Sequence, residues 1–134
     1  MAKSLIYVVN SGAQAVAADG VVSLGTVVRR YGCNLNLSGN GVEVRGAGYY
    51  TFNCNIVAEP AATGSITATL MKDGVPIPGA SATANAATAD VPVTLPIIGV
   101  IREGCGCADS ASTITCVLSA DANVTNAVLL GERA

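Results

Sequence analysis

The sequence has 134 residues, a length that suits one domain with its own buried core. Only 12% of the residues are charged, with seven Lys and Arg against nine Asp and Glu and no basic run, which argues against nucleic acid as a partner. The chain has no histidine, so neither a Ser-His-Asp triad nor a Cys-His pair is available for catalysis. A surface so poor in charge suits a chain that hides part of it in an assembly.

The N-terminal segment, residues 1–12, reads MAKSLIYVVNSG and contains an apolar run of only five residues, 5–9. This run is too short for the core of a signal peptide or for a membrane span. We therefore expect the chain to fold in a cytosol and to have no membrane partner. The segment is either the first strand of the domain or an arm that is free to bind a partner.

Short apolar or alternating runs, separated by Gly, Asn, Asp and Pro, follow one another along the chain and favour strands over helices. In residues 49–58, one face carries Tyr50, Phe52 and Cys54, and the other face is uncharged, with Tyr49, Thr51, Asn53 and Asn55. Asp73-Gly74 and Asn40-Gly41 are typical of tight hairpin turns. Residues 80–90, rich in Ala and Thr, are either a strand or a loop. The spacing predicts strands over 4–9, 14–17, 20–30, 33–37, 42–45, 48–58, 65–72, 75–82, 91–101, 112–119 and 124–131.

Five cysteines are present, an odd and irregularly spaced set that argues against a disulfide framework. Cys105 and Cys107 lie in the segment EGCGCAD, which raises the question of a metal or redox site. Because C-x-C spacing is a poor metal-binding pattern and no histidine is present, we interpret the segment as a glycine-rich turn. Cys54 and Cys116 are in phase with apolar neighbours and are predicted to be core residues.

Oxygen ligands for calcium are the one ion-binding pattern that stays open. Asp109, Asp121 and Asn123 fall in predicted loops and carry the oxygen atoms that calcium prefers. The alternative is that they are ordinary turn-forming residues. Apart from this possible calcium site, we expect no cofactor and no metal site.

The segment Gly48-Tyr49-Tyr50-Thr51-Phe52 resembles the G-x-Y-x-F strand of C1q/TNF-like jelly rolls. In the right order, residues 70–74 (LMKDG) resemble the family's L-x-x-N-G hairpin, 78–81 (PGAS) its v-x-G-S, and 126–131 (NAVLLG) its closing central strand. The resemblance covers about residues 42–131. It is closest to phage head-fibre or decoration proteins and to the C-terminal domains of exosporium collagen-like proteins. The lack of a Gly-X-Y stalk and of a signal peptide favours the phage members.

The resemblance implies an all-β fold, a two-sheet antiparallel jelly-roll sandwich of about ten strands, with residues 1–134 as a single domain. It further implies a homotrimer without enzymatic activity. The function predicted is that of a tailed-phage head fibre or capsid decoration protein, located on the virion surface and assembled in the bacterial host cytoplasm. The alternative is a receptor- or glycan-binding head of a phage fibre or a spore-surface protein.

The resemblance also implies that aromatic residues of the 48–58 strand help to line the trimer axis. Tyr49, Tyr50 and Phe52 are predicted to divide between the domain core and the trimer interface. Leu129 on the closing strand is also predicted for that interface. The alternative is that the aromatic residues are ordinary core or rim residues. Lys3, Leu5 and Tyr7 of the N-terminal segment are predicted to contact the capsid or another virion protein.

Overall fold

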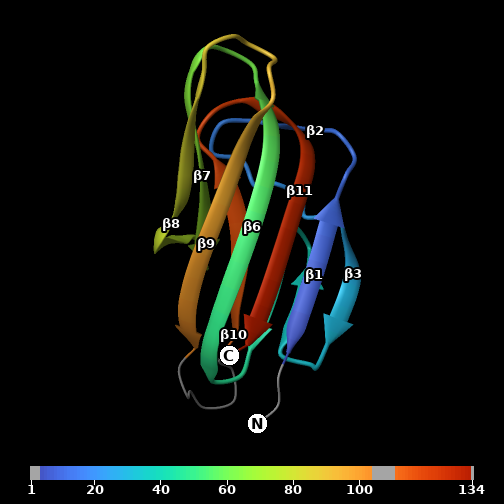
Figure 1. Cartoon of the computed structure of the whole chain (residues 1–134). Coiled ribbons are helices and arrows are strands. Elements are labelled where there is room, and N and C mark those ends of the chain that lie inside the picture. The colour runs from blue at the N-terminus through green and yellow to red at the C-terminus, as the bar shows by residue number, and fades with distance from the viewer. Residues whose placement is uncertain (1–3, 104–110, 134) are drawn as a thin grey trace.

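The structure, a computed structural model, describes residues 4–103 and 111–133, which form two antiparallel sheets packed face to face (Figure 1). We call them the front and back sheets. The front sheet has the order β3 (Thr26–Tyr31), β1 (Leu5–Asn10), β11 (Ala122–Arg133), β6 (Gly48–Pro60), β9 (Val93–Glu103), and β2 (Gln14–Val16) also pairs with β11. The back sheet has the order β4 (Leu35–Ser38), β5 (Gly41–Arg45), β10 (Ala111–Leu118), β7 (Gly64–Lys72), β8 (Val75–Ala86).

The prediction of an all-β, two-sheet antiparallel sandwich is confirmed, with eleven strands among the described residues. Residues 80–90, which the sequence left open, divide: β8 continues to Ala86, and the rest connects it to β9. No helix of a length and apolarity that would cross a membrane occurs among the described residues.

The core lies between the two sheets and is built by period-2 alternation along the long strands. In β9, for example, Leu95, Ile97 and Ile101 are buried while Ile98 and Val100 between them are exposed. In β11 the phase of alternation changes because the register with β6 shifts between Val124 and Asn126. Such a bulge adds one residue to one strand, which keeps apolar residues on the core side both before and after it.

Two turn predictions have different outcomes. Asp73 and Gly74 both have positive φ angles, 51° and 82°, as a two-residue hairpin between β7 and β8 requires. The Asn40-Gly41 prediction is wrong in its register. The positive φ, 58°, belongs to Gly39, and Gly41 is instead the first, buried residue of β5.

The predicted strand over 20–30 is also corrected. Val21 forms an isolated bridge to Val117 of the back sheet, and only Thr26–Tyr31 forms a strand, in the front sheet. Gly25 has a φ of 78°, a left-handed conformation that turns the chain from one sheet to the other. The buried side chains of Val22 and Leu24 fill the space between the sheets on the way.

The two ends of the described chain lie at the same pole of the sandwich (Figure 1). Leu5 pairs with Glu132, and the Arg133 amide donates a 2.9 Å hydrogen bond to the Ser4 carbonyl. Leu5–Asn10 therefore runs as a strand between β3 and β11, hydrogen-bonded on both edges. Of the two possibilities left open for residues 1–12, Leu5–Asn10 takes the first, a strand of the domain.

Candidate functional site

The side of the front sheet that faces away from the core carries few charges and many apolar side chains. We call this surface the outer face. It is formed by alternate residues of four neighbouring strands, as the pairing registers and the burial of the intervening residues show. The outer face comprises Leu5, Tyr7 and Val9 of β1, Val128, Leu130 and Glu132 of β11, Tyr49, Thr51, Asn53 and Asn55 of β6, and Pro96, Ile98, Val100 and Arg102 of β9.

The strand registers align these side chains in rows across the sheet. Cross-strand neighbours on one face lie close enough to form a continuous surface. One row has an apolar residue on three of its four strands, and the next row repeats the arrangement. These rows are Tyr7–Leu130–Asn53–Ile98 and Val9–Val128–Asn55–Pro96.

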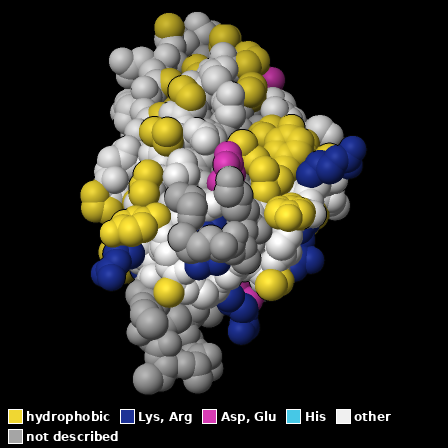
Figure 2. Space-filling model, turned by 60° about the horizontal axis from the view of Figure 1, so that its bottom comes forward, with side chains coloured by type: hydrophobic (Ala, Val, Ile, Leu, Met, Phe, Trp, Pro, Cys, Tyr) yellow, Lys and Arg dark blue, Asp and Glu magenta, His cyan; other side chains and the backbone are white. Residues whose placement is uncertain are grey.

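Large apolar side chains are unusually exposed on the outer face. Tyr49, Ile98 and Val100 are 57%, 61% and 58% exposed. Figure 2, in which the pole that bears the two described chain ends comes forward, shows patches of apolar side chains among uncharged ones, with Lys and Arg side chains at the sides and in the lower middle of the view. A contiguous apolar surface of this kind marks an interaction site more often than a single exposed residue does.

A shallow hollow of about 410 Å³ lies at the centre of the outer face. Its lining comes from all four strands and includes the whole first row and, apart from Val9, the second row. Asn53 and Asn55 lie between the apolar side chains of β11 on one side and of β9 on the other. The hollow is therefore largely apolar, with two amide groups in its middle.

The back sheet has a different outer side. There, alternate residues of its two central strands are threonines, including Thr67 and Thr69 of β7 and Thr113 and Thr115 of β10. Hydroxyl groups hydrogen-bond readily to water, so this side suits exposure to solvent. The two sides of the sandwich thus differ in chemistry, and only the front one resembles a surface meant to be covered.

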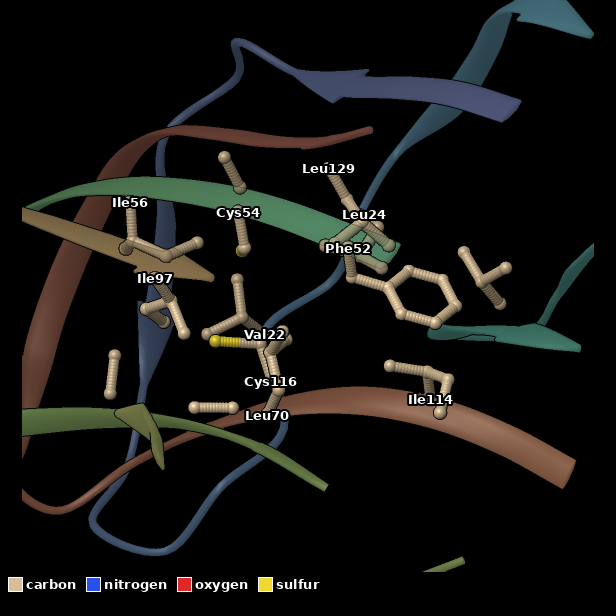
Figure 3. Packing of buried hydrophobic residues seen from close by; sticks show 14 of the residues in the cluster. Val22, Leu24, Phe52, Cys54, Ile56, Leu70, Ile97, Ile114, Cys116 and Leu129 are labelled. Carbon is tan, nitrogen blue, oxygen red and sulfur yellow. The ribbon is translucent and has the colours of Figure 1, made fainter. Parts of the chain in front are cut away.

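Of the four residues predicted for a trimer interface, the structure leaves Tyr49 exposed on the outer face. Tyr50, Phe52 and Leu129 are 0% exposed and belong to the core of a single chain. Figure 3 shows Phe52 and Leu129 among the packed side chains between the sheets. The structure therefore places Tyr50 and Phe52 on the core side of the predicted division, and Leu129 with them, where side chains enclosed within one chain have no surface to offer a second copy. Whether Tyr49 contacts another copy stays a prediction.

Tyr50 has a structural role that explains its burial. Its hydroxyl donates to the backbone carbonyls of Arg45 and Gly46, at 3.0 and 2.9 Å. This contact ties the end of β5 to the start of β6. Burial raises the pKa of the Tyr50 hydroxyl, Glu103 adds to the rise, and Arg133 opposes it.

The structure describes two of the three residues predicted to contact a capsid. Leu5 and Tyr7 are half-buried in β1, with their side chains on the outer face. Lys3 lies outside the described residues. Leu5 and Tyr7 therefore belong to the same surface as Tyr49 and Ile98, and contact with a virion protein stays a prediction for them.

Cys54 and Cys116 are buried core residues, as predicted, and they extend from opposite sheets into the same part of the core (Figure 3). Interaction with the Cys116 thiol, and then burial, raise the pKa of the Cys54 thiol well above its ordinary value. Cys105 and Cys107 lie outside the described residues.

Two of the three residues considered for calcium make hydrogen bonds within the chain. Asp121 Oδ1 accepts a 2.7 Å hydrogen bond from the Ala18 amide, and Asn123 Nδ2 donates to Glu59 Oε1 at 3.3 Å. Asp109 lies outside the described residues. Within residues 4–103 and 111–133, no three His, Cys, Asp or Glu side chains gather as a metal site would require.

Comparison with known proteins bears on the fold. No protein-family model and no curated protein matches the sequence. Among solved structures, the globular domain of zebrafish complement 1qA superposes with a TM-score of 0.71 at 12% identity, covering 95% of this chain and 94% of that one. Murine APRIL gives 0.68 at 17% identity, covering 98% and 99%.

The fold is a C1q/TNF-like jelly roll. The PRD1 vertex protein P5 shares it with a TM-score of 0.58 at 11% identity, over 97% of this chain and 72% of that one. Domains of this fold are typically trimeric and non-enzymatic. The expectation of a jelly roll, drawn from short motifs spread over residues 42–131, is thereby confirmed.

Sequence reasoning missed the β9 and β11 contributions to the outer face. The signal was present, since Pro96, Ile98 and Val100 alternate with equally apolar residues of the core side. A strand that is apolar on both sides indicates burial on both. In the described chain only the core side of β9 is covered. Its other side is apolar but exposed, as expected of a surface that a second molecule buries.

Proposed function

We propose that this protein is a non-enzymatic structural protein that assembles as a homotrimer through the outer face. The apolar, charge-poor character of that face carries the proposal. Removing apolar surface from water stabilises an assembly by roughly 25 cal/mol per Å². Large exposed side chains such as Tyr49, Ile98 and Val100 would supply that area, and the fold's usual trimeric state supports the stoichiometry.

We further propose that the trimer is a component of a virion surface, as a head fibre or capsid decoration protein of a tailed phage. The fold shared with the PRD1 vertex protein supports this role. The motif resemblance to phage head-fibre proteins, together with the low charge of the chain, supports it as well. Because Leu5 and Tyr7 lie on the outer face, the proposed trimer uses them for contact between copies, and contact with a capsid would use surfaces outside the three outer faces.

The assembly is tested by the native mass of the full chain, measured by light scattering on a sizing column with reductant present. A trimer has three times the 13.3 kDa mass of the chain, about 40 kDa. Ile98→Asp and Tyr49→Asp place a carboxylate on the outer face, and each variant is expected to run near 13 kDa while keeping its strand circular dichroism.

Val91→Asp is the matched control, because Val91 is also an exposed apolar residue but precedes β9 and lies outside the outer face. It is expected to keep the wild-type mass. A wild-type chain that runs as a monomer at micromolar concentration, or an Ile98→Asp variant that still forms trimers, would contradict the proposed assembly.

The virion role needs a separate experiment. Phage particles induced from the host that carries the gene are purified by density gradient and analysed by mass spectrometry. We expect the chain to band with the capsid proteins and to be lost when surface proteins are stripped from intact heads. Its absence from purified particles would overturn the virion proposal and leave the trimer proposal standing.

A further inference from the structure

Two asparagines occupy the centre of an otherwise apolar surface. Asn53 and Asn55 lie two residues apart on β6, so both side chains emerge on the outer face, and both are exposed. Their row neighbours are apolar on each side: Leu130 and Ile98 flank Asn53, and Val128 and Pro96 flank Asn55. Both asparagines line the central hollow.

Folding of the single chain does not require amides at these positions. Asparagine is depleted in β-strands, where valine or threonine fits the pleated surface better. Within the described chain, neither side-chain amide has a hydrogen bond to another protein group, in contrast to Asn34, whose side chain bonds to Ser4 and to the Arg45 carbonyl. The chain thus carries two unused amides in the middle of a surface that we propose is covered.

Covering that surface changes the demands on these groups. An amide that loses its water without gaining a partner destabilises the buried state, so nearly all buried polar groups are hydrogen-bonded. The cross-strand neighbours of Asn53 and Asn55 are apolar and cannot supply such bonds, and within the described chain no hydrogen bond joins either amide to the other or to Thr51 on the same strand. The partners must come from the molecule that covers the face.

Symmetry indicates which groups these are. In a closed ring, every copy presents the same surface around one axis. The asparagine side chain has both a donor and an acceptor, so each copy can donate to the next and accept from the previous one. A single polar residue within an apolar seam is also a known way to fix the register and number of subunits.

We propose that Asn53 and Asn55 of each copy hydrogen-bond to the same residues of the neighbouring copies around the symmetry axis. This inference rests on the proposed trimer and deepens it. The apolar residues of the outer face supply affinity, and the two amides determine how many copies assemble and in which alignment. The site is incomplete in one chain because each amide lacks the partner that another copy provides.

The first test replaces the Asn53 amide with a carboxylate, so that the equivalent residues of neighbouring copies repel one another. Asn53→Asp replaces the side-chain NH2 group by an oxygen of similar size but brings like charges of the neighbouring copies together, which raises the pKa of the carboxyl groups. We expect this variant to run as a monomer at pH 7.5 and to return to about 40 kDa below about pH 5, where the acids become neutral and pair again. Asn85→Asp, on an exposed position of β8 in the back sheet, is the matched control and is expected to keep the wild-type mass throughout.

The second test removes the polarity altogether. Asn53→Val combined with Asn55→Val keeps the face fully apolar, and we expect the variant to remain associated but to give several masses in place of one. A single 40 kDa species for this double variant, or an Asn53→Asp trimer that is stable at pH 7.5, would overturn the proposed ring while the trimer itself stood. A monomeric wild-type protein would overturn both.

Discussion

Cys54 and Cys116 illustrate how single side chains join the two sheets. Cys54 belongs to β6 of the front sheet and Cys116 to β10 of the back sheet, and both are buried in the common core. A thiol in such surroundings behaves as a small apolar group as long as it keeps its proton. Because the Cys116 thiol and burial raise the pKa of Cys54, its neutral form persists to higher pH in the folded state than in the unfolded state.

A pH dependence of stability follows from this shift. Above a pH of about 8.5 the unfolded chain loses the Cys54 proton while the folded chain keeps it, so the free energy of unfolding falls as the pH rises. Urea unfolding of the wild type, in reductant, is expected to show lower stability at pH 9.5 than at pH 7.5. Cys54→Val removes this contribution, and its stability should fall less between the two pH values. An equal fall in both proteins would show that Cys54 does not contribute.

At the scale of strands, the buried ring of Phe52 depends on a glycine of the neighbouring strand. Phe52 of β6 pairs with Gly131 of β11 on one side and with Gly99 of β9 on the other. A Cβ atom at Gly131 would lie 2.8 Å from Phe52 Cε1 and 3.3 Å from Ile6 Cγ2. The ring of Phe52 thus fits because β11 carries no side chain at Gly131, whereas a Cβ atom at Gly99 would meet Ala80 of the back sheet, at 2.9 Å.

Gly131→Ala is therefore expected to destabilise the protein, by roughly 1–3 kcal/mol, since a fully buried ring has no space to move into. Urea unfolding at one protein concentration measures the effect. Gly12→Ala is the matched control, because a Cβ there meets only Asn10 Oδ1, at an ordinary 3.5 Å, and its stability should be unchanged. Adding Phe52→Leu to Gly131→Ala should restore part of the loss if the ring contact is its cause, and no recovery would contradict that cause.

Alternation of apolar and polar residues was enough to predict most strands. Each long strand has one side in the core, and the alternation indicates which residues lie on that side. It could not identify the exposed side of β9, since residues 93–101 are apolar on both sides. Nor did it predict that the strand expected over 20–30 is interrupted at Gly25. The chain passes from one sheet to the other there through a positive φ angle, which does not alter the alternation of apolar and polar residues. Tyr50 and Phe52 were assigned correctly to one side of β6, but whether that side faced the core or another copy depends on the packing of the back sheet.

At the scale of the whole molecule, self-assembly links stability to concentration. A trimer dissociates as it unfolds, so mass action raises its melting temperature as the protein concentration rises. We expect the melting temperature of the wild-type protein to increase by roughly several degrees when the protein concentration is raised a hundredfold. The Ile98→Asp variant should melt at one temperature throughout. A wild-type melting temperature independent of concentration would contradict dissociation coupled to unfolding.

The shared pole of the two chain ends also makes the order of the strands adjustable. Leu5 and Glu132 are paired neighbours, so a short linker can join the ends, and new ends can be opened in the exposed segment 61–63 between β6 and β7. Such a circular permutant keeps every strand intact. Cargo fused to the original ends would leave from one pole of the sandwich and cargo fused to the new ends from the opposite pole, so the proposed trimer could display three payloads, one per subunit, in either direction.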